Sequence, residues 1–497
     1  MNTNVANLQA THVIETTRVI TAYLMAAISL FVGGFQLLAH GPIWMLWIST
    51  ITLTGVGFFG IIYMLTSRSF LTPWNIFATS LALGYGFGSL NTMLSEYVID
   101  GDFSMVTSAN AGTIGLAMGA TLVLTAILLL LGSVDNYELI PRQHFSDNDQ
   151  RDTLIVLLVV TLGTVVAVST GLLGYQGNQS GGNTSQQVSP LASLVVSSMT
   201  ATLSTTVLAF AGRPQARRVN WLLISCCFIL LGVQATQGRR VFMFSILICA
   251  IAYFASHGIR RLLTTKGVAT IIGVVVLVSG VMRFFYAMRV ATRSDMGATS
   301  LAELVQAGWH VFQNPELYNL ANDLSENNST RTFIIGYLAE LIQASEESGA
   351  WVGGQLAIFD FAMSVPTVIW PGKWKIIEES YAEEGVCHPV FGLPLWDASN
   401  TALTAGFCDF RWLGLLLYPL LVVAMMTLAN RLVWRSPIVV RSLVCFATME
   451  GMMQVENQLS AYLTSVRNLA VLCLFGWLLV WIRRRNDGQP VQSGISA

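Results

Sequence analysis

The sequence predicts an all-α fold, a polytopic bundle of about twelve transmembrane helices with one long loop on the outer side. Hydrophobic residues make up 54% of the 497 positions and charged residues only 11%. The mean hydropathy is +0.61, whereas a soluble domain carries about 25% charged residues. Many apolar runs approach the roughly 20 residues that cross about 30 Å of hydrocarbon. The runs lack the alternation of barrel strands, so helices are the structure that satisfies their backbone in lipid.

Twelve apolar segments are the candidate spans. They cover residues 19–39, 43–65, 74–94, 108–132, 153–174, 190–211, 221–236, 241–256, 267–288, 412–430, 442–457 and 462–482. The first follows Arg18 and resembles a signal peptide, but it has no convincing small-residue cleavage site and further spans follow, so we interpret it as a retained anchor. The chain thus divides into spans at 1–288, a large outer loop at 289–411, further spans at 412–482 and a tail at 483–497.

The distribution of basic residues predicts the orientation. Alternate connections carry Arg68; Arg142 and Arg151; Arg213, Arg217 and Arg218; Arg260, Arg261 and Lys266; Arg431, Arg435 and Arg441; and the RRR run at 483–485. The intervening connections at 39–42, 95–103 and 175–190 have no basic residue. Both termini are therefore expected inside the cell. The formal net charge of −1 argues against a nucleic-acid partner.

Several arginines depart from this rule, among them Arg283, Arg331 and Arg467. Arg239 and Arg240 lie in an outer turn, Arg289 and Arg293 follow the ninth span at i, i+4 spacing, and Arg411 precedes the tenth span. A guanidinium group is always charged and binds phosphate through two parallel hydrogen bonds. We interpret these last five arginines as a pyrophosphate-binding cradle at the outer membrane surface. The alternative is that these arginines contact lipid headgroups or pair with acids in the bundle.

The long outer loop has its own local pattern. Residues 310–332 are polar and predict a loop. Residues 351–366 are apolar but too short to span, which favours a re-entrant or interfacial helix. Further along, Ser399 is expected to cap a short helix that runs toward the next span.

These loop motifs are similar to those of a known family. The segment IWPGKW (369–374), the Ser/Asn/Thr helix start (399–401) and GFCDFRWLG (406–414) before a span resemble the outer loop of Wzy-type oligosaccharide repeat-unit polymerases, as does GRRVFMF (238–244). The resemblance covers about residues 236–430. The chain has Asp-Phe-Arg where the family usually has Asn-Phe-Gly, and it lacks an Arg and the final Pro around Trp370.

The resemblance implies a GT-C-like bundle in the bacterial inner membrane and a function in polysaccharide biosynthesis. Such enzymes transfer an undecaprenyl-diphosphate-linked glycan onto the nonreducing end of another lipid-linked repeat unit and release undecaprenyl diphosphate. Membrane lipids and a Wzz-type chain-length regulator are the other expected partners. No cofactor is implied, and no His/Asp/Glu cluster in the sequence has metal-ligand spacing.

Glycosyl transfer needs a base that accepts the proton of the acceptor hydroxyl. His388 is the first candidate, because an unperturbed imidazole pKa near 6.5 suits proton transfer. Asp397 and Asp409 are further catalytic candidates, and Glu340 and Asp360 are rivals that the sequence does not rank. Two acids of the eleventh span, Glu450 and Glu456, are costly in lipid and are expected to pair with an arginine such as Arg467.

Two other functions stay open. An O-antigen ligase would use outer arginines and a long outer loop in the same way. A lipid-linked oligosaccharide flippase is the second alternative, although such a transporter does not need so long an outer loop. The cysteines add one hypothesis. Cys387 and Cys408 are expected on the outer, oxidising side, where a disulfide between them is possible.

Overall fold

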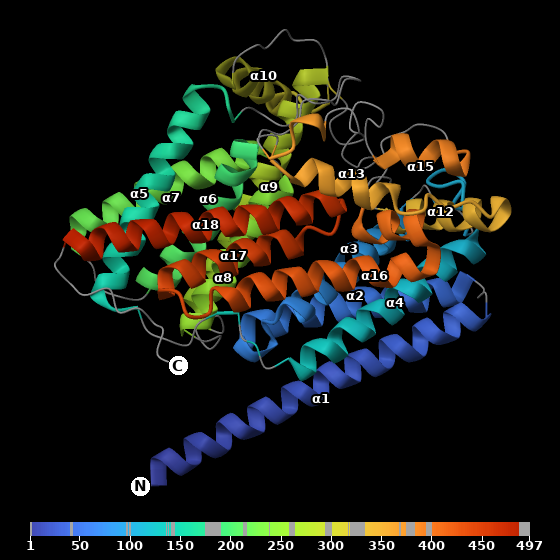
Figure 1. Cartoon of the computed structure of the whole chain (residues 1–497), viewed down its shortest axis with the longest axis horizontal. Helices are drawn as coiled ribbons and strands as arrows, with labels where there is room; N and C mark the ends of the chain where they lie inside the picture. Colours follow the sequence, from blue (N-terminus) through green and yellow to red (C-terminus); the bar gives the residue numbers. More distant parts are fainter. Residues whose placement is uncertain are drawn as a thin grey trace. The chain divides into compact units, whose positions relative to one another are not determined.

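The structure is a computed structural model, and every regular element that it describes is a helix (Figure 1). The described residues are 2–39, 43–95, 98, 101–135, 137, 139–140, 145–173, 190–211, 216–237, 239–257, 264–293, 301–316, 318, 333–366, 369–373, 383–393 and 400–486.

A helix occurs at each of the twelve expected spans. These helices are α1 (Asn2–Ala39), α2 (Ile43–Thr66), α3 (Pro73–Met93), α4 (Ala111–Val134), α5 (Asp147–Ser169), α6 (Pro190–Phe210), α7 (Arg217–Gln237), α8 (Arg239–His257), α9 (Thr265–Arg293), α16 (Ala402–Leu432), α17 (Ile438–Met453) and α18 (Leu459–Asn486). Among the described residues, eight helices are long and apolar enough to cross a membrane: α1, α2, α4, α5, α6, α7, α16 and α18. The protein is therefore a polytopic helical membrane protein by length and composition.

The other four helices are shorter or more polar. Within the described residues, the apolar stretches of α8 and α9 are Val241–Ser256 and Val276–Met288, which are below span length, and α17 has 16 residues. Helix α3 has 21 residues, but buried polar side chains such as Asn75, Thr79 and Ser89 lie along it. Since these side chains face protein, α3 does not need the hydropathy of a lipid-facing helix.

The chain forms two compact units. Unit 1 comprises Met1–Leu139, Glu326–Thr427 and Met452–Thr464, and unit 2 comprises Ile140–Ser325, Leu428–Gly451 and Ser465–Ala497. The long segment 289–411 is divided, because residues up to Ser325 belong to unit 2 and those from Glu326 to unit 1.

Unit 1 contains the antiparallel packing of α1 with α4 and of α2 with α3. The α1–α4 contact is close at Gly33, where a Cβ atom would lie 2.8 Å from the carbonyl oxygen of Gly119. Small residues of this kind let membrane helices approach closely. Three further helices belong to this unit: α12 (Ile334–Ser348), α13 (Gln355–Ser364) and α15 (Glu383–Phe391). Helix α12 packs on α3 and α4, and α15 contacts α12 and α13.

The expected interfacial segment 351–366 contains α13, a helix of only 10 residues. A short helix at this position is confirmed. The residue that was predicted to cap the following helix was wrong. Ser399 lies outside the described residues, and the hydroxyl oxygen of Thr401 accepts from the backbone N–H groups of Leu403 (3.2 Å) and Thr404 (3.1 Å). Thr401 holds this place because it directly precedes the first turn of α16.

Helix α16 is broken after Asp409. Phe410 (φ −136°, ψ 20°) and Arg411 (φ 53°, ψ −137°) have non-helical backbone angles. A Cβ atom on Gly406 would lie 2.3 Å from the carbonyl oxygen of Gly414. Residues eight apart in a straight helix are about 12 Å apart, so the chain turns sharply at Phe410 and Arg411. The second part of α16, after Arg411, corresponds to the expected tenth span.

Unit 2 contains α5 to α9, α17 and most of α18. Helix α5 begins with a capping box, in which the Ser146 side chain and the Asp149 side chain each accept a backbone N–H of the other residue. Helix α6 packs against α5, α7 and α8. An additional helix, α10 (Leu301–Gln313), packs on α9 through Val311, which contacts the cluster around Tyr286 and Val290. The segment predicted as loop from residue 310 therefore starts inside a helix.

Candidate functional site

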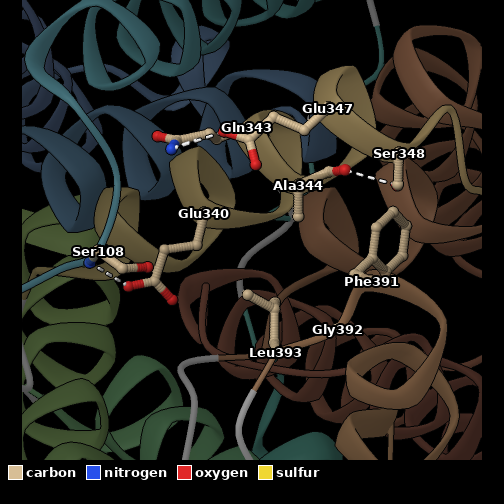
Figure 2. Close-up of a pocket in the computed structure, with 9 residues that line it drawn as sticks. All are labelled: Ser108, Glu340, Gln343, Ala344, Glu347, Ser348, Phe391, Gly392 and Leu393. Carbon is tan, nitrogen blue, oxygen red and sulfur yellow. Dashed lines mark hydrogen bonds between the residues drawn. The ribbon is translucent and has the colours of Figure 1, made fainter.

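A polar pocket of about 330 Å³ lies in unit 1, beside α12 (Figure 2). Its lining residues are Ser108; Glu340, Gln343, Ala344, Glu347 and Ser348 of α12; and Phe391, Gly392 and Leu393 at the end of α15. Two of the nine are carboxylates. The pocket therefore offers hydrogen-bond acceptors together with one aromatic and two aliphatic side chains.

Helix α12 presents this face because of its spacing. The lining positions 340, 343, 344, 347 and 348 follow the i, i+3, i+4, i+7, i+8 pattern of a single helical face. The opposite face is apolar and buried, with Ile335, Leu338 and Ile342 fully covered. The helix ends at Gly349, whose φ of 68° is the left-handed conformation that glycine adopts at helix C-termini.

Glu340 is the most constrained carboxylate of the pocket. It is only 6% exposed, and its Oε1 accepts hydrogen bonds from the Thr107 hydroxyl and the Ser108 backbone N–H, both at 2.8 Å. Figure 2 shows the second carboxylate oxygen turned away from Ser108, into the pocket on the side of Leu393. Glu340 thus has one oxygen anchored to the protein and one available to a bound molecule.

Glu347 and Gln343 form the outer part of the same face. Gln343 donates from Nε2 to a Glu347 oxygen at 3.0 Å, and its own Oε1 accepts from the Asn110 backbone N–H at 2.9 Å. Asn110 in turn caps α4 through a bond from the Thr113 N–H to its side-chain oxygen, at 2.9 Å. The polar stripe of α12 is therefore connected to the start of α4.

His388, the first candidate for the base, lies outside the pocket lining. Its side chain is fully buried, and Nε2 is 3.1 Å from the Tyr337 hydroxyl. Tyr337 stands one helical turn before Glu340 on α12, and the His388 carbonyl oxygen accepts the Leu393 N–H at 2.9 Å. The histidine thus fixes the end of α15, which forms one pocket wall. Its catalytic role stays a prediction.

Asp409 binds the N-terminus of α13. The buried carboxylate accepts backbone N–H groups from Gly354 (3.0 Å), Leu356 (3.1 Å) and Ala357 (2.9 Å), and the Tyr418 hydroxyl also donates to it. A carboxylate at this position satisfies amides that have no partner in the helix and faces the positive end of its dipole. Asp409 therefore has a clear structural role, whereas its catalytic role stays a prediction.

Asp360 lies within α13 and is 2% exposed. Burial raises the pKa of its carboxyl to about 7, hydrogen bonds from Ser460 oppose this, and the negative charge of Asp409 adds to it. Its Oδ2 has no hydrogen-bond partner among the described residues. Asp360 is therefore the acid of this region that titrates near neutral pH.

Arg411 is the only non-glycine residue with positive φ among the described residues. Its guanidinium donates to the Ser345 carbonyl oxygen of α12 at 3.0 Å, and its buried Nε has no partner. Such a conformation costs about 1–3 kcal/mol and is found mostly at functional sites. Glycine would adopt it readily, and glycine is the residue that the resembling family has at this position.

The other four arginines of the expected cradle lie in unit 2. Arg239 and Arg240 begin α8, and Arg289 and Arg293 are in the last two turns of α9. Their backbone is helical, but their side chains are outside the described structure. Asp397 also lies outside the described residues. The cradle and the role of Asp397 therefore stay predictions.

Two expected pairings were wrong, the Cys387–Cys408 disulfide and the pairing of Glu450 with an arginine, whereas the pairing of Glu456 stays a prediction. Cys387 of α15 and Cys408 of α16 are both buried and are not joined in a disulfide. Glu450 is hydrogen-bonded by the Thr200 hydroxyl at 2.9 Å and has no arginine partner among the described residues. The reason is that Glu450 of α17 faces α6, where hydroxyl groups rather than cations line the contact.

The sequence did not single out Gln343, Glu347 or residues 391–393 of the pocket wall. The polar stripe of α12 was visible as helical spacing of Glu340, Gln343 and Glu347, but its partners Thr107 and Ser108 lie more than 200 positions away. Within the described ranges, no group of three His, Cys, Asp or Glu side chains could hold a metal ion. Comparison of the chain with family models, with curated proteins and with solved structures gives no match.

Proposed function

We propose that the protein is a membrane glycosyltransferase that polymerises undecaprenyl-diphosphate-linked oligosaccharide repeat units at the periplasmic face of the bacterial inner membrane. The proposal includes twelve spans in a GT-C-like bundle with both termini cytoplasmic. It rests on the membrane character of the helices, on the loop motifs of residues 236–430, and above all on one local observation. That observation is the anchored Glu340 carboxylate in the polar pocket of α12.

The pocket chemistry suits a sugar acceptor. Carboxylate and amide oxygens bind hydroxyl groups, and Glu340, Gln343 and Glu347 supply them in this pocket. Because two hydrogen bonds fix Oε1, the Glu340 carboxylate cannot turn away from the hydroxyl group of the acceptor sugar.

The proposed step is a displacement at the anomeric carbon of the lipid-linked donor glycan. The acceptor hydroxyl of the incoming repeat unit gives its proton to Glu340 as its oxygen forms the new glycosidic bond. The bond between the anomeric carbon and the diphosphate breaks, and the electron pair leaves with undecaprenyl diphosphate. The negative charge on the leaving group requires a cation, for which Arg411 is the candidate in unit 1.

The experiment is polymerisation of a defined lipid-linked repeat unit by the purified protein. Glu340→Gln keeps a carbonyl oxygen for Thr107 and Ser108 but removes the base, so we expect kcat to fall about 10²–10⁴-fold. Glu346→Gln is the control on the same helix, because Glu346 is exposed and does not line the pocket, and its rate should stay within about tenfold of wild type. A Glu340→Gln enzyme that folds normally and polymerises at the wild-type rate would refute the role of Glu340.

The reaction products separate the proposal from the two other functions. A polymerase extends the lipid-linked unit without lipid A core. A ligase forms product only when lipid A core is added, and a flippase forms no new glycosidic bond in either mixture. Either of the last two results would overturn the proposed function.

A further inference from the structure

Four polar side chains from four helices of unit 2 meet in the bundle. They are Thr200 of α6, Gln234 of α7, Ser245 of α8 and Glu450 of α17, and none is more than 3% exposed. The Thr200 hydroxyl is 2.9 Å from Glu450 Oε1, 2.8 Å from the Ser245 hydroxyl and 2.6 Å from Gln234 Nε2. Glycosyl transfer at the pocket of unit 1 makes no use of this cluster.

The hydrogen atoms in the cluster can be counted. Three oxygen–oxygen contacts form a chain, from Glu450 to Thr200, from Thr200 to Ser245, and from Ser245 to the Val241 carbonyl oxygen at 2.8 Å. If Glu450 is ionised, only the two hydroxyl protons of Thr200 and Ser245 are available for these three contacts. One contact of 2.8–2.9 Å would then bring two lone pairs together without a proton, which is unfavourable.

A proton on Glu450 completes the chain. Its carboxyl O–H donates to Thr200, the Thr200 hydroxyl donates to Ser245, and the Ser245 hydroxyl donates to the Val241 carbonyl oxygen. The Thr200 oxygen then accepts two hydrogen bonds, from Glu450 and from Gln234 Nε2, which is its full capacity. Each of the four contacts now contains one hydrogen.

The charge environment agrees with a neutral carboxyl. Among the described residues, the bond with Thr200 is the one hydrogen bond of Glu450, and its buried Oε2 has no partner. The buried Oε1 of Gln234 also has none. A buried carboxylate without a cation or further donors is strongly disfavoured, and it takes up a proton instead.

The other charged and titratable residues of the surrounding helices lie on other helical turns than these four positions. On α17, Arg441 is nine residues before Glu450, about 13.5 Å along the axis, and it lies over the Trp434 ring at 3.8 Å. The others are Arg217, Arg218, Cys226 and Cys227 of α7; Arg239, Arg240, Cys249, Tyr253 and His257 of α8; Cys445 of α17; and Arg467 and Cys473 of α18, with the terminal arginines 483–485. Described α6 has no charged residue.

We propose that Glu450 is a proton-binding site inside unit 2, which carries its proton at neutral pH and donates it in a hydrogen bond to the Thr200 hydroxyl oxygen. Ionisable groups at membrane depth are typical of proton pathways. The bound species is a proton, and the site does not depend on the glycosyltransferase function. Separate measurements therefore test the two proposals.

The test is infrared spectroscopy of the full-length protein in lipid nanodiscs as the pH is raised from acid to alkaline. At pH 7 the wild type should show the C=O stretch of a protonated carboxyl that is missing in Glu450→Gln. Thr200→Val removes the acceptor of the carboxyl proton, so this band should move to higher frequency. Thr202→Val is the matched control, because Thr202 is a buried threonine of the same helix whose hydroxyl oxygen has no partner.

Three results would overturn the proposal. They are the absence of a carboxyl band at pH 7 in the wild type, a band that Glu450→Gln leaves in place, and a band that Thr200→Val does not move. A sodium-dependent rise in melting temperature, lost in Glu450→Gln, would assign the site to a metal cation instead. If Glu450→Gln does not fold, the pH titration of the wild-type band and its shift in Thr200→Val still decide the question.

Discussion

Asp409 and Lys373 hold the two ends of helix α13. The Asp409 carboxylate accepts three backbone N–H groups at the N-terminus, and the buried Lys373 ammonium donates to the Val365 carbonyl oxygen at 2.6 Å at the C-terminus. Negative charge at the start of a helix and positive charge at its end both stabilise its dipole. The two residues belong to the two separate loop motifs, IWPGKW and GFCDFRWLG. A helix of 10 residues, marginal by itself, is thereby fixed in place.

The first prediction concerns this anchor. Asp409→Ala leaves three amide donors and the Tyr418 hydroxyl without their acceptor, so we expect a loss of about 2–4 kcal/mol, above the 0.5–2 kcal/mol of an ordinary N-cap. Asp102→Asn is the control, because Asp102 accepts only the Ser104 N–H at an exposed turn, and its change should stay within about 0.5 kcal/mol. Thermal unfolding in detergent measures both. Equal melting temperatures for the two variants would contradict the anchor.

The second prediction concerns Arg411. At an ordinary helix position glycine is about 1 kcal/mol less stable than alanine. At φ 53° and ψ −137° the order should reverse, so that Arg411→Gly is more stable than Arg411→Ala by about 1 kcal/mol. Both variants lack the guanidinium, so the comparison isolates the backbone. A higher melting temperature for the alanine variant would refute the sharp turn of α16.

If Arg411 also binds the leaving diphosphate, both variants should lose activity whatever their stability. A more stable but less active Arg411→Gly protein would indicate that strain is kept for function. Full polymerisation by Arg411→Gly would assign the arginine to the bond with Ser345 alone.

The third prediction follows from Asp360. Its folded pKa of about 7 exceeds the unfolded value of 3.8, so the folded state binds this proton more tightly. The stabilisation that this bound proton gives the folded state is fully present below pH about 4. It is lost as the pH rises to about 7, by up to about 1.4 kcal/mol for each pH unit. Asp360→Asn, which cannot ionise, should remove this slope. Melting temperatures between pH 4 and 8 test it, and identical slopes in the two proteins would be the contrary result.

The fourth prediction concerns Arg239, Arg240, Arg289 and Arg293. If they hold the diphosphate, replacement of any one by Lys should reduce polymerisation more than about tenfold although the charge is kept, because an ammonium cannot form the bidentate pair. Alanine should be worse, by about 10²–10³-fold. Arg435→Lys, at an exposed connection between α16 and α17, is the control. Protein levels in the membrane are measured alongside, since misinsertion would give the same phenotype.

Near wild-type rates in all four Lys variants would refute the cradle. These arginines would then be lipid or helix contacts, which a point charge serves equally well.

The helices were predictable because a lipid environment constrains each segment of the chain separately. A backbone in hydrocarbon must satisfy its hydrogen bonds within the segment, so run length and hydropathy indicate a helix directly. The short helix before the tenth span was expected, but the sharp turn at Phe410 and Arg411 that separates residues 402–409 from the span was not. Nothing in Asp-Phe-Arg predicts positive φ, because arginine rarely adopts it.

The sequence by itself determined that this chain is a helical membrane protein with a polar, proline-containing segment between its ninth and tenth predicted spans. Only the tertiary structure decided what the charged residues of that segment contact. Glu340 bonds to Ser108 across 232 positions, and Asp409 caps a helix that begins 54 positions earlier. Side-chain contacts over such separations depend on how helices pack, and packing joins faces whose partners no local pattern specifies. For this reason the sequence could only name Asp409 and Glu340 as equal candidates. The tertiary structure shows that Asp409 caps a helix and that Glu340 faces a pocket.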